Sequence, residues 1–223
     1  MGYRLRDDLS FCTANDKSAF LDHRLGKYFC LPPRAECAFQ SLVNGRSLSE
    51  NEIVDLLPLI SQGMLVDWPG EDTAIEGTSL SPPSKAAMDE FAERPDALQC
   101  VYAAIGHIQS DIGYRPISLM QTVEMIKRRK IRKVSNSRSL TDTGVRRSVS
   151  AFLSTRRLMV TQDRCIRWSI SMINHLARSN YYPSLVIGVS MKPFGAHAWV
   201  QDGDYVLSDY VDNVLPFTPI LVV

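Results

Sequence analysis

Long hydrophobic runs are missing from this 223-residue sequence, and their absence argues against a membrane protein. No stretch approaches the roughly 20 apolar residues that a helix needs to cross a bilayer. The first residues, MGYRLRDDLSFCTAND, also lack the apolar core of a secretory signal peptide. We therefore expect a cytoplasmic protein without a membrane partner.

An excess of charge of one sign is missing as well. Lys and Arg number 25 against 24 Asp and Glu, which gives a net charge of +1. Nothing in this balance draws the protein to nucleic acid, so we expect no nucleic-acid partner. Hydrophobic residues at 45% and charged residues at 22% are instead typical of a folded globular protein.

Metal and cofactor motifs are also lacking. The five cysteines contain no Cys-x-x-Cys pair of the kind found in zinc sites and redox couples. A glycine-rich loop that could hold phosphates is absent too. We interpret the cysteines as reduced thiols, and we expect neither a metal site nor a cofactor.

The first 68 residues have the pattern of short strands followed by helices. Apolar runs separated by turn-forming residues predict strands, and apolar residues at helical spacing predict helices. The capping box formed by Ser49 and Glu52 marks the start of the second helix. The predicted elements are strands over 9–13, 19–22 and 27–31, helices over 34–43 and 49–63, and a strand over 64–68. Together they predict a small winged-helix-like domain over residues 1–68.

A polar connection separates this domain from the rest of the chain. Residues 69–85, PGEDTAIEGTSLSPPSK, are rich in Pro, Gly, Ser and Thr and have no sustained period, so we predict an exposed linker. Residues 86–158 have helical periodicity, and we expect these helices to pack around the site that follows. One predicted apolar face consists of Leu98, Val101, Tyr102, Ile105 and Ile108. The predicted fold class is α+β, with a second domain over residues 86–223.

The candidate nucleophile is Cys165, near the start of a predicted helix over residues 162–180. The unpaired amides and the positive dipole end of a helix N-terminus favour a thiolate, and they can lower a cysteine pKa well below about 8.5. Gln162, three residues earlier, is a candidate hydrogen-bond donor to an oxyanion. A lone cysteine early in an apolar helix is usually a buried small side chain, so its interpretation depends on the residues that follow.

A base and an orienting acid follow Cys165 on a predicted hairpin. Strands are predicted over 184–190, 196–200 and 205–210, with an Asp-Gly turn at 202–203 before the last one. A simple hairpin carries Asp209 back toward His197, which lies in the AHAWV stretch.

Cys165, His197 and Asp209 are therefore the predicted catalytic residues. In such a triad the imidazole of His197 takes the thiol proton, and Asp209 orients the ring and stabilises the imidazolium. Three other acids compete with Asp209 for this role, namely Asp202, Asp204 and Asp212. Each of them is as easily interpreted as a turn or surface residue.

The residues of this triad and their surroundings resemble a known family. The segment from Cys165 through LVIGV, the PF-x-AHAWV stretch and the following Asp209 are similar, in order and spacing, to the transglutaminase-like B proteins of lasso peptide biosynthesis. The resemblance implies a transglutaminase-like, papain-like cysteine peptidase domain that removes the leader from a ribosomally made precursor. Residues 1–68 resemble the precursor-recognition domain that many of these proteins carry.

The same resemblance implies how the leader of the lasso precursor peptide binds. The leader would add as a strand to the edge strand over 27–31 and pack against the second helix. The candidate leader-binding residues are Tyr28, Phe29, Leu31, Ile53 and Leu57. The released core peptide would pass to an ATP-dependent, asparagine-synthetase-like lasso cyclase, which is the expected protein partner.

Two other functions remain open from the sequence. A transglutaminase-like acyltransferase would keep the triad but pass the acyl group to an amine in place of water. A non-catalytic, winged-helix peptide-binding module would leave the C-terminal domain without chemistry. Product masses distinguish the first alternative from hydrolysis.

Overall fold

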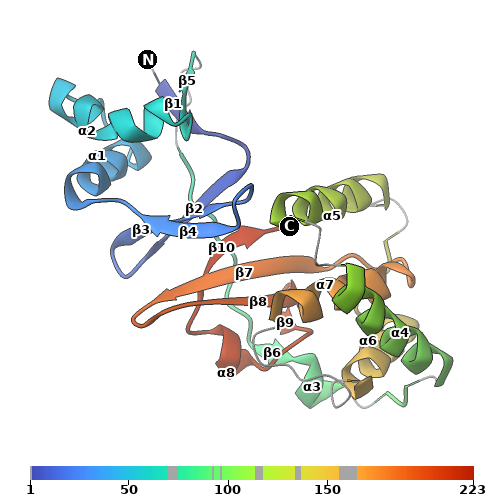
Figure 1. The fold of residues 1–223 in the computed structure, drawn as a ribbon. Helices are drawn as coiled ribbons and strands as arrows, with labels where there is room; N and C mark the ends of the chain where they lie inside the picture. The colour runs from blue at the N-terminus through green and yellow to red at the C-terminus, as the bar shows by residue number, and fades with distance from the viewer. Residues whose placement is uncertain are drawn as a thin grey trace.

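The computed structural model describes residues 2–69, 75–91, 93–95, 97–113, 118–133, 137–155 and 165–223. These residues form a mixed α+β structure in which helices cover three sheets (Figure 1). Within the same ranges, no helix is long and apolar enough to cross a membrane.

The N-terminal strands and helices are those that the sequence predicts. The strands are β2 (Leu9–Ala14), β3 (Lys17–Asp22), β4 (Lys27–Cys30) and β5 (Leu65–Trp68), and the helices are α1 (Pro33–Val43) and α2 (Glu50–Ser61). The capping box is confirmed, because the Glu52 carboxylate accepts from the Ser49 amide at 2.8 Å while the Ser49 hydroxyl accepts from the Glu52 amide. A further strand, β1 (Gly2–Leu5), was not predicted and pairs with β5.

One face of the β2-β3-β4 sheet carries a row of phenylalanines. Phe11, Phe20 and Phe29 lie opposite one another across the three strands. The ring centroid of Phe20 is 5.7 Å from that of Phe11 and 5.0 Å from that of Phe29. Phe39 of α1 meets Phe11 and Phe20 edge-on, each at 5.0 Å. Stacked and edge-to-face rings are favoured geometries, so this cluster fixes α1 over the sheet.

The C-terminal sheet has the strand order β10-β7-β8-β9-β6. Its strands are β6 (Lys85–Ala86), β7 (Ser184–Met191), β8 (Phe194–Asp202), β9 (Tyr205–Val206) and β10 (Thr218–Val222). The strands predicted over 184–190 and 196–200 are confirmed. The strand predicted over 205–210 is wrong beyond Val206, because the chain leaves the sheet there and forms a short helix, α8 (Val211–Val214).

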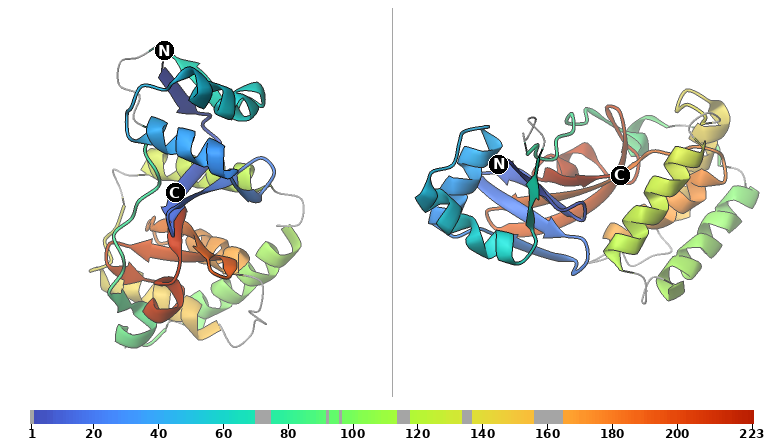
Figure 2. Two further views of the ribbon diagram at one scale, coloured as in Figure 1. Left: turned by 90° about the vertical axis from the view of Figure 1, so that its left-hand side faces the viewer. Right: turned by 90° about the horizontal axis from the view of Figure 1, so that it is seen from above.

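Helices cover the C-terminal sheet on one side (Figure 2). They are α3 (Ala87–Glu90), α4 (Ala97–Gly113), α5 (Leu119–Lys133), α6 (Thr143–Ser154) and α7 (Cys165–Ala177). Helix α7 packs on β7 and β8, and α4 and α6 pack on α7.

The apolar face predicted for α4 does not pack around the site. Its residues Leu98, Val101, Tyr102 and Ile105 are between 42% and 59% exposed, and the side chain of Ile108 lies outside the described residues. The buried face of α4 instead carries Ala103 and His107. The predicted face of α4 was wrong because the helix is buried through a small residue, Ala103, and a polar residue, His107, and not through its large apolar side chains.

The other face of the β2-β3-β4 sheet packs against the C-terminal half. It carries small side chains such as Cys12 and Ala19, which are buried with Leu21 in one continuous core that also contains Ile187 and Ile220. Strand β10 lies between β2 and β7 (Figure 1). The N-terminal sheet is therefore a middle layer whose two faces belong to two different cores.

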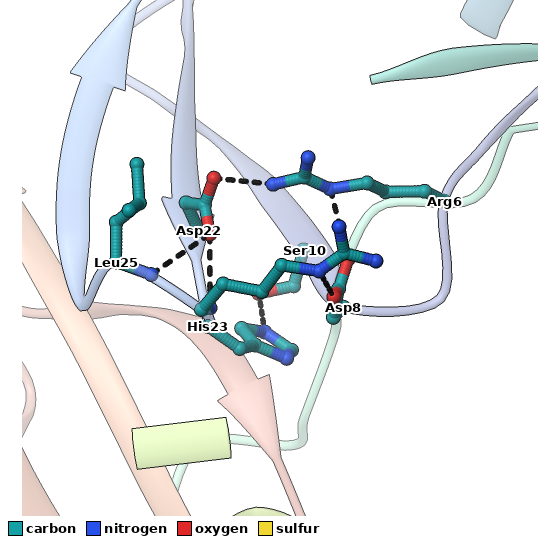
Figure 3. A network of polar contacts seen from close by, with 7 residues as sticks. Arg6, Asp8, Ser10, Asp22, His23 and Leu25 are labelled. Carbon is teal, nitrogen blue, oxygen red and sulfur yellow. Dashed lines mark hydrogen bonds and ion pairs between the residues drawn. The ribbon is translucent and has the colours of Figure 1, made fainter. Parts of the chain in front are cut away.

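A charged network holds the turn between β3 and β4 (Figure 3). The Asp22 carboxylate accepts from the Leu25 amide at 3.1 Å and pairs with Arg6. Arg6 also pairs with Asp8 at 2.8 Å. Because the turn is fixed by side chains from β3 and from the segment before β2, the start of β4 is fixed as well.

Truncation of Leu21 tests the core that the two sheets share. Leu21 is fully buried, so Leu21→Ala should lower the free energy of unfolding by about 2–5 kcal/mol. The control Leu25→Ala removes a side chain that is 67% exposed and should change it by less than about 0.5 kcal/mol. Urea unfolding followed by circular dichroism should show one cooperative transition, and two separate transitions would contradict a shared core.

Candidate active site

The first turns of α7 are tied to the strand and the loop that carry the other two candidate residues. The indole Nε1 of Trp168 donates to the Ser208 carbonyl at 3.0 Å, and the Ser169 hydroxyl donates to the Ala198 carbonyl at 3.1 Å. Trp168 and Ser169 are both buried, so these bonds are largely shielded from water. Cys165, the first residue of α7, is thereby held beside β8.

His197 and Asp209 form a hydrogen-bonded pair. Nε2 of His197 on β8 lies 2.9 Å from Oδ2 of Asp209. The other carboxylate oxygen of Asp209 accepts from the Tyr210 amide at 2.9 Å and from the Asn213 side-chain amide of α8 at 2.8 Å. Because both carboxylate oxygens are engaged, the acid is fixed and in turn orients the imidazole.

The thiol of Cys165 hydrogen-bonds with the imidazole of His197. Nε2 is occupied by Asp209, so Nδ1 is the ring nitrogen left for the thiol. The backbone amides of Ala198 and Ile166 also donate to the sulfur. Burial raises the pKa of the Cys165 thiol, but the imidazole and the two amides outweigh it and hold that pKa below its usual range.

The pKa values of His197 and Asp209 shift in the directions that favour their charged forms. Burial lowers the pKa of His197, but its hydrogen bonds with Asp209 and Cys165 raise it to about 9. Burial raises the pKa of Asp209, but hydrogen bonds from His197, Asn213 and the Tyr210 amide bring it below its usual range. All three shifts therefore favour the charged forms, which are a thiolate, an imidazolium and a carboxylate. A thiolate can attack a carbonyl, and an imidazolium can protonate the leaving group.

A glycine opposite His197 makes room for the aromatic rings beside the imidazole. Gly188 of β7 pairs with His197, and a Cβ at this position would lie 2.8 Å from the Trp199 ring and 2.9 Å from the Phe217 Cβ. The imidazole centroid is 6.2 Å from that of Trp199 and 5.3 Å from that of Phe217. The position of the imidazole therefore depends on glycine at residue 188.

The acids that compete with Asp209 are placed elsewhere. Asp202 accepts from the Tyr181 hydroxyl at 2.6 Å, and Asp204 pairs with Lys85 at 3.3 Å. Asp212 is exposed on α8. Of these four acids, the structure brings Asp209 to the imidazole.

The remaining histidines are bonded to hydroxyl groups. His175 contacts the Ser148 hydroxyl at 3.1 Å, and His107 contacts Thr155 at 2.7 Å. Nε2 of His23 lies 3.0 Å from the Ser10 hydroxyl (Figure 3). Among the described residues, no group of three or more His, Cys, Asp or Glu is placed to hold a metal ion.

The predicted leader-binding residues divide between two surroundings. Phe29 and Leu31 pack against the N-terminal core, whereas Tyr28 packs against the core of the C-terminal half. On α2, Leu57 is exposed and Ile53 is half-buried. The predicted oxyanion donor, Gln162, lies outside the described residues.

Several residues of the site were missed by the sequence analysis. Asn213 holds Asp209, and Trp168 and Ser169 hold α7 against its neighbours. The Ser208 hydroxyl, next to Asp209, accepts from the Val200 amide at 2.9 Å. A polar residue on the short segment after the hairpin was the available signal for Asn213. Trp168, Ser169 and Ser208 gave no such signal. Each lies in an apolar stretch of the sequence, where it cannot be told apart from an ordinary core residue.

Comparison with known proteins bears on the C-terminal half. Residues 115–222 match the transglutaminase-like superfamily. This range runs from before α5 into β10 and contains Cys165, His197 and Asp209. Comparisons with curated proteins and with solved structures gave no match. The C-terminal half therefore contains a transglutaminase-like core domain, a domain type associated with cysteine hydrolases and acyltransferases.

The pH dependence of Cys165 alkylation tests the ion pair. Because the pKa of Cys165 is lowered and that of His197 is raised to about 9, iodoacetamide should alkylate Cys165 at a lower pH than it alkylates an ordinary thiol. His197→Ala removes the partner, so alkylation should then require a higher pH. Mass spectrometry of the fragment that contains Cys165 gives the rate, with exposed Cys37 as the internal reference. The same pH profile in both proteins would show that His197 does not act on the thiol.

Substitution of Gly188 tests the packing behind the imidazole. Gly188→Ala places a Cβ under 3 Å from Trp199 and Phe217, so it should destabilise the protein by about 1–3 kcal/mol and slow alkylation of Cys165 at neutral pH. Gly195→Ala is the matched control on β8, because its Cβ would meet Phe217 at an ordinary 3.7 Å. Thermal unfolding and the alkylation assay measure the two effects, and equal behaviour of both variants would contradict this account.

Proposed function

We propose that the protein is a cysteine endopeptidase that removes the leader from a lasso precursor peptide. The observation that carries this proposal is the hydrogen-bonded series of Cys165, His197 and Asp209 inside a transglutaminase-like domain. The substrate class follows from the resemblance of the PF-x-AHAWV stretch and its surroundings to the B proteins of lasso peptide biosynthesis.

Cleavage would take place in two stages. The Cys165 thiolate attacks the carbonyl carbon of the scissile bond, and the His197 imidazolium gives its proton to the amine of the departing core peptide. The leader is then held as a thioester. Neutral His197 takes a proton from a water molecule, which attacks the thioester, releases the leader as a carboxylic acid and restores the thiolate and imidazolium pair. Asp209 keeps the ring oriented in both stages.

The leader would bind along β4, at one end of the β2-β3-β4 sheet. In the described part of the chain, no backbone group bonds to the outer edge of β4. The opposite edge is partly covered, because the Phe11 carbonyl of β2 accepts from the Thr78 amide at 2.8 Å. An extended peptide can add to an open sheet edge through main-chain hydrogen bonds. The open edge supports β4 as the place where the leader pairs.

The cell location and the protein partner belong to the same proposal. A cytoplasmic peptidase would release the core peptide where ATP is present for ring closure. The product would pass to an asparagine-synthetase-like cyclase, which we propose as the physical partner.

Mass spectrometry of precursor peptides encoded beside this gene tests the function. Wild-type protein should cut one bond at the leader-core junction and add the mass of one water molecule, and Cys165→Ala should lose this activity while still binding the leader. The reaction is run with and without the neighbouring cyclase. Cleavage by Cys165→Ala at the wild-type rate would remove the proposed nucleophile, and a product joined to an amine would identify an acyltransferase.

A further inference from the structure

Through Tyr28, strand β4 of the N-terminal sheet meets the start of β8, the strand that carries His197. Successive side chains of a strand point to opposite faces, so Phe29 joins the phenylalanine row while Tyr28 faces the C-terminal half. Tyr28 packs against the same core as Cys165 and Met191. Its ring meets that of Phe194, the first residue of β8, edge-on at 5.7 Å.

Within the part of the chain that the structure describes, the phenol of Tyr28 is a hydrogen-bond donor with no acceptor. Tyr28 is half-buried, and its hydroxyl bonds to no other residue of the described ranges. Burial raises the pKa of Tyr28, and negative charge at Cys165 raises it further, to about 12. The hydroxyl therefore keeps its proton at neutral pH. A partly desolvated donor gains from a ligand that supplies an acceptor.

A peptide bound at Cys165 would bring such acceptors. A substrate lying across the nucleophile presents backbone carbonyls on both sides of the scissile bond. The Phe194 ring beside Tyr28 is 56% exposed, so it leaves apolar surface next to the phenol. Ligand sites commonly combine apolar side chains with a few polar groups that fix the orientation of the ligand, and the Tyr28 hydroxyl beside the Phe194 ring is such a combination.

We propose that Tyr28 is a substrate-contacting residue through which the N-terminal half forms one side of the peptidase site. Its hydroxyl donates to a backbone carbonyl near the scissile bond, and the rings of Tyr28 and Phe194 pack against the side chains there. The inference rests on the proposed peptidase function. It adds that the sheet that binds the leader also positions the bond to be cut.

A structural role for Tyr28 makes different predictions. If the ring only fills the space between the two halves, loss of the hydroxyl leaves turnover unchanged and loss of the ring lowers stability. If Tyr28 contacts the substrate in the transition state, loss of the hydroxyl lowers kcat without lowering stability. Tyr28→Phe separates these cases, because it keeps the ring.

The test compares the full-length wild type with Tyr28→Phe and Tyr28→Ala, and uses Tyr3→Phe as the matched control. Tyr3 lies on β1 and packs against the N-terminal core. Tyr28→Phe should lower kcat for precursor cleavage by about three- to tenfold, the effect of one lost hydrogen bond. The Kd of the isolated leader, measured by fluorescence anisotropy, and the midpoint of thermal unfolding should stay as in the wild type. Tyr3→Phe should match the wild type in all three measurements.

Two kinetic results would overturn the inference. A wild-type kcat in Tyr28→Phe would remove the hydroxyl from the reaction. A rise in KM and in leader Kd at unchanged kcat would place Tyr28 in leader recognition alone. In both cases cleavage itself would still support the peptidase function.

A measurement without peptide keeps the two proposals separable. Removal of the ring should open the approach to the thiol, so Tyr28→Ala should speed alkylation of Cys165 by N-ethylmaleimide more than alkylation by the smaller iodoacetamide. Equal changes for both reagents would contradict a position beside the nucleophile. If the wild type leaves the precursor uncut and the maleimide rate still rises, the leader-peptidase proposal falls while the placement of Tyr28 stands.

Discussion

The whole site depends on how α7 is held against β8. The Trp168 indole bonds to the Ser208 carbonyl and the Ser169 hydroxyl bonds to the Ala198 carbonyl, so one helix is fixed to both the strand and the loop beside it. The proposed nucleophile, base and acid come from these three different segments. Since a shift of about 1 Å between reacting groups can cost a factor of about 100 in rate, two buried bonds at this junction matter more than their modest energies suggest.

Burial alone would make the cysteine inert, and the protein contains an example. The pKa of Cys12, a buried thiol of the core, is raised by burial and by nearby Cys30 to about 12. Burial acts in the same direction on Cys165, but there the imidazole of His197 and the amides of Ala198 and Ile166 reverse the shift. The difference between a packing thiol and a reactive one is thus the set of donors aimed at the sulfur.

Local sequence patterns predicted those elements whose formation depends on residues close together in the sequence. The capping box at Ser49, the alternating strands and the hairpin that returns Asp209 to His197 all depend on neighbours in sequence. Strands β1, β6 and β10 were missed because each is short and pairs with a distant segment. The acid's second partner, Asn213, and the contact of Tyr28 with Phe194 at the start of β8 also depend on the tertiary fold, which no local period encodes.

If the leader pairs with β4 as proposed, the two buried faces of the β2-β3-β4 sheet would couple substrate binding to catalysis. Phenylalanines fix α1 on one face, and Leu21 and its neighbours join the other face to the core under β7 and β10. Rotation of this sheet relative to the C-terminal half would expose apolar surface to water, which costs a free energy of about 25 cal/mol for each Å² exposed. A leader paired with β4 would therefore be held at a fixed place relative to Cys165, and the scissile bond would reach the thiolate in an intramolecular step. In such an enzyme, pairing of the leader with β4 would select the substrate, and contacts at the scissile bond would only align it.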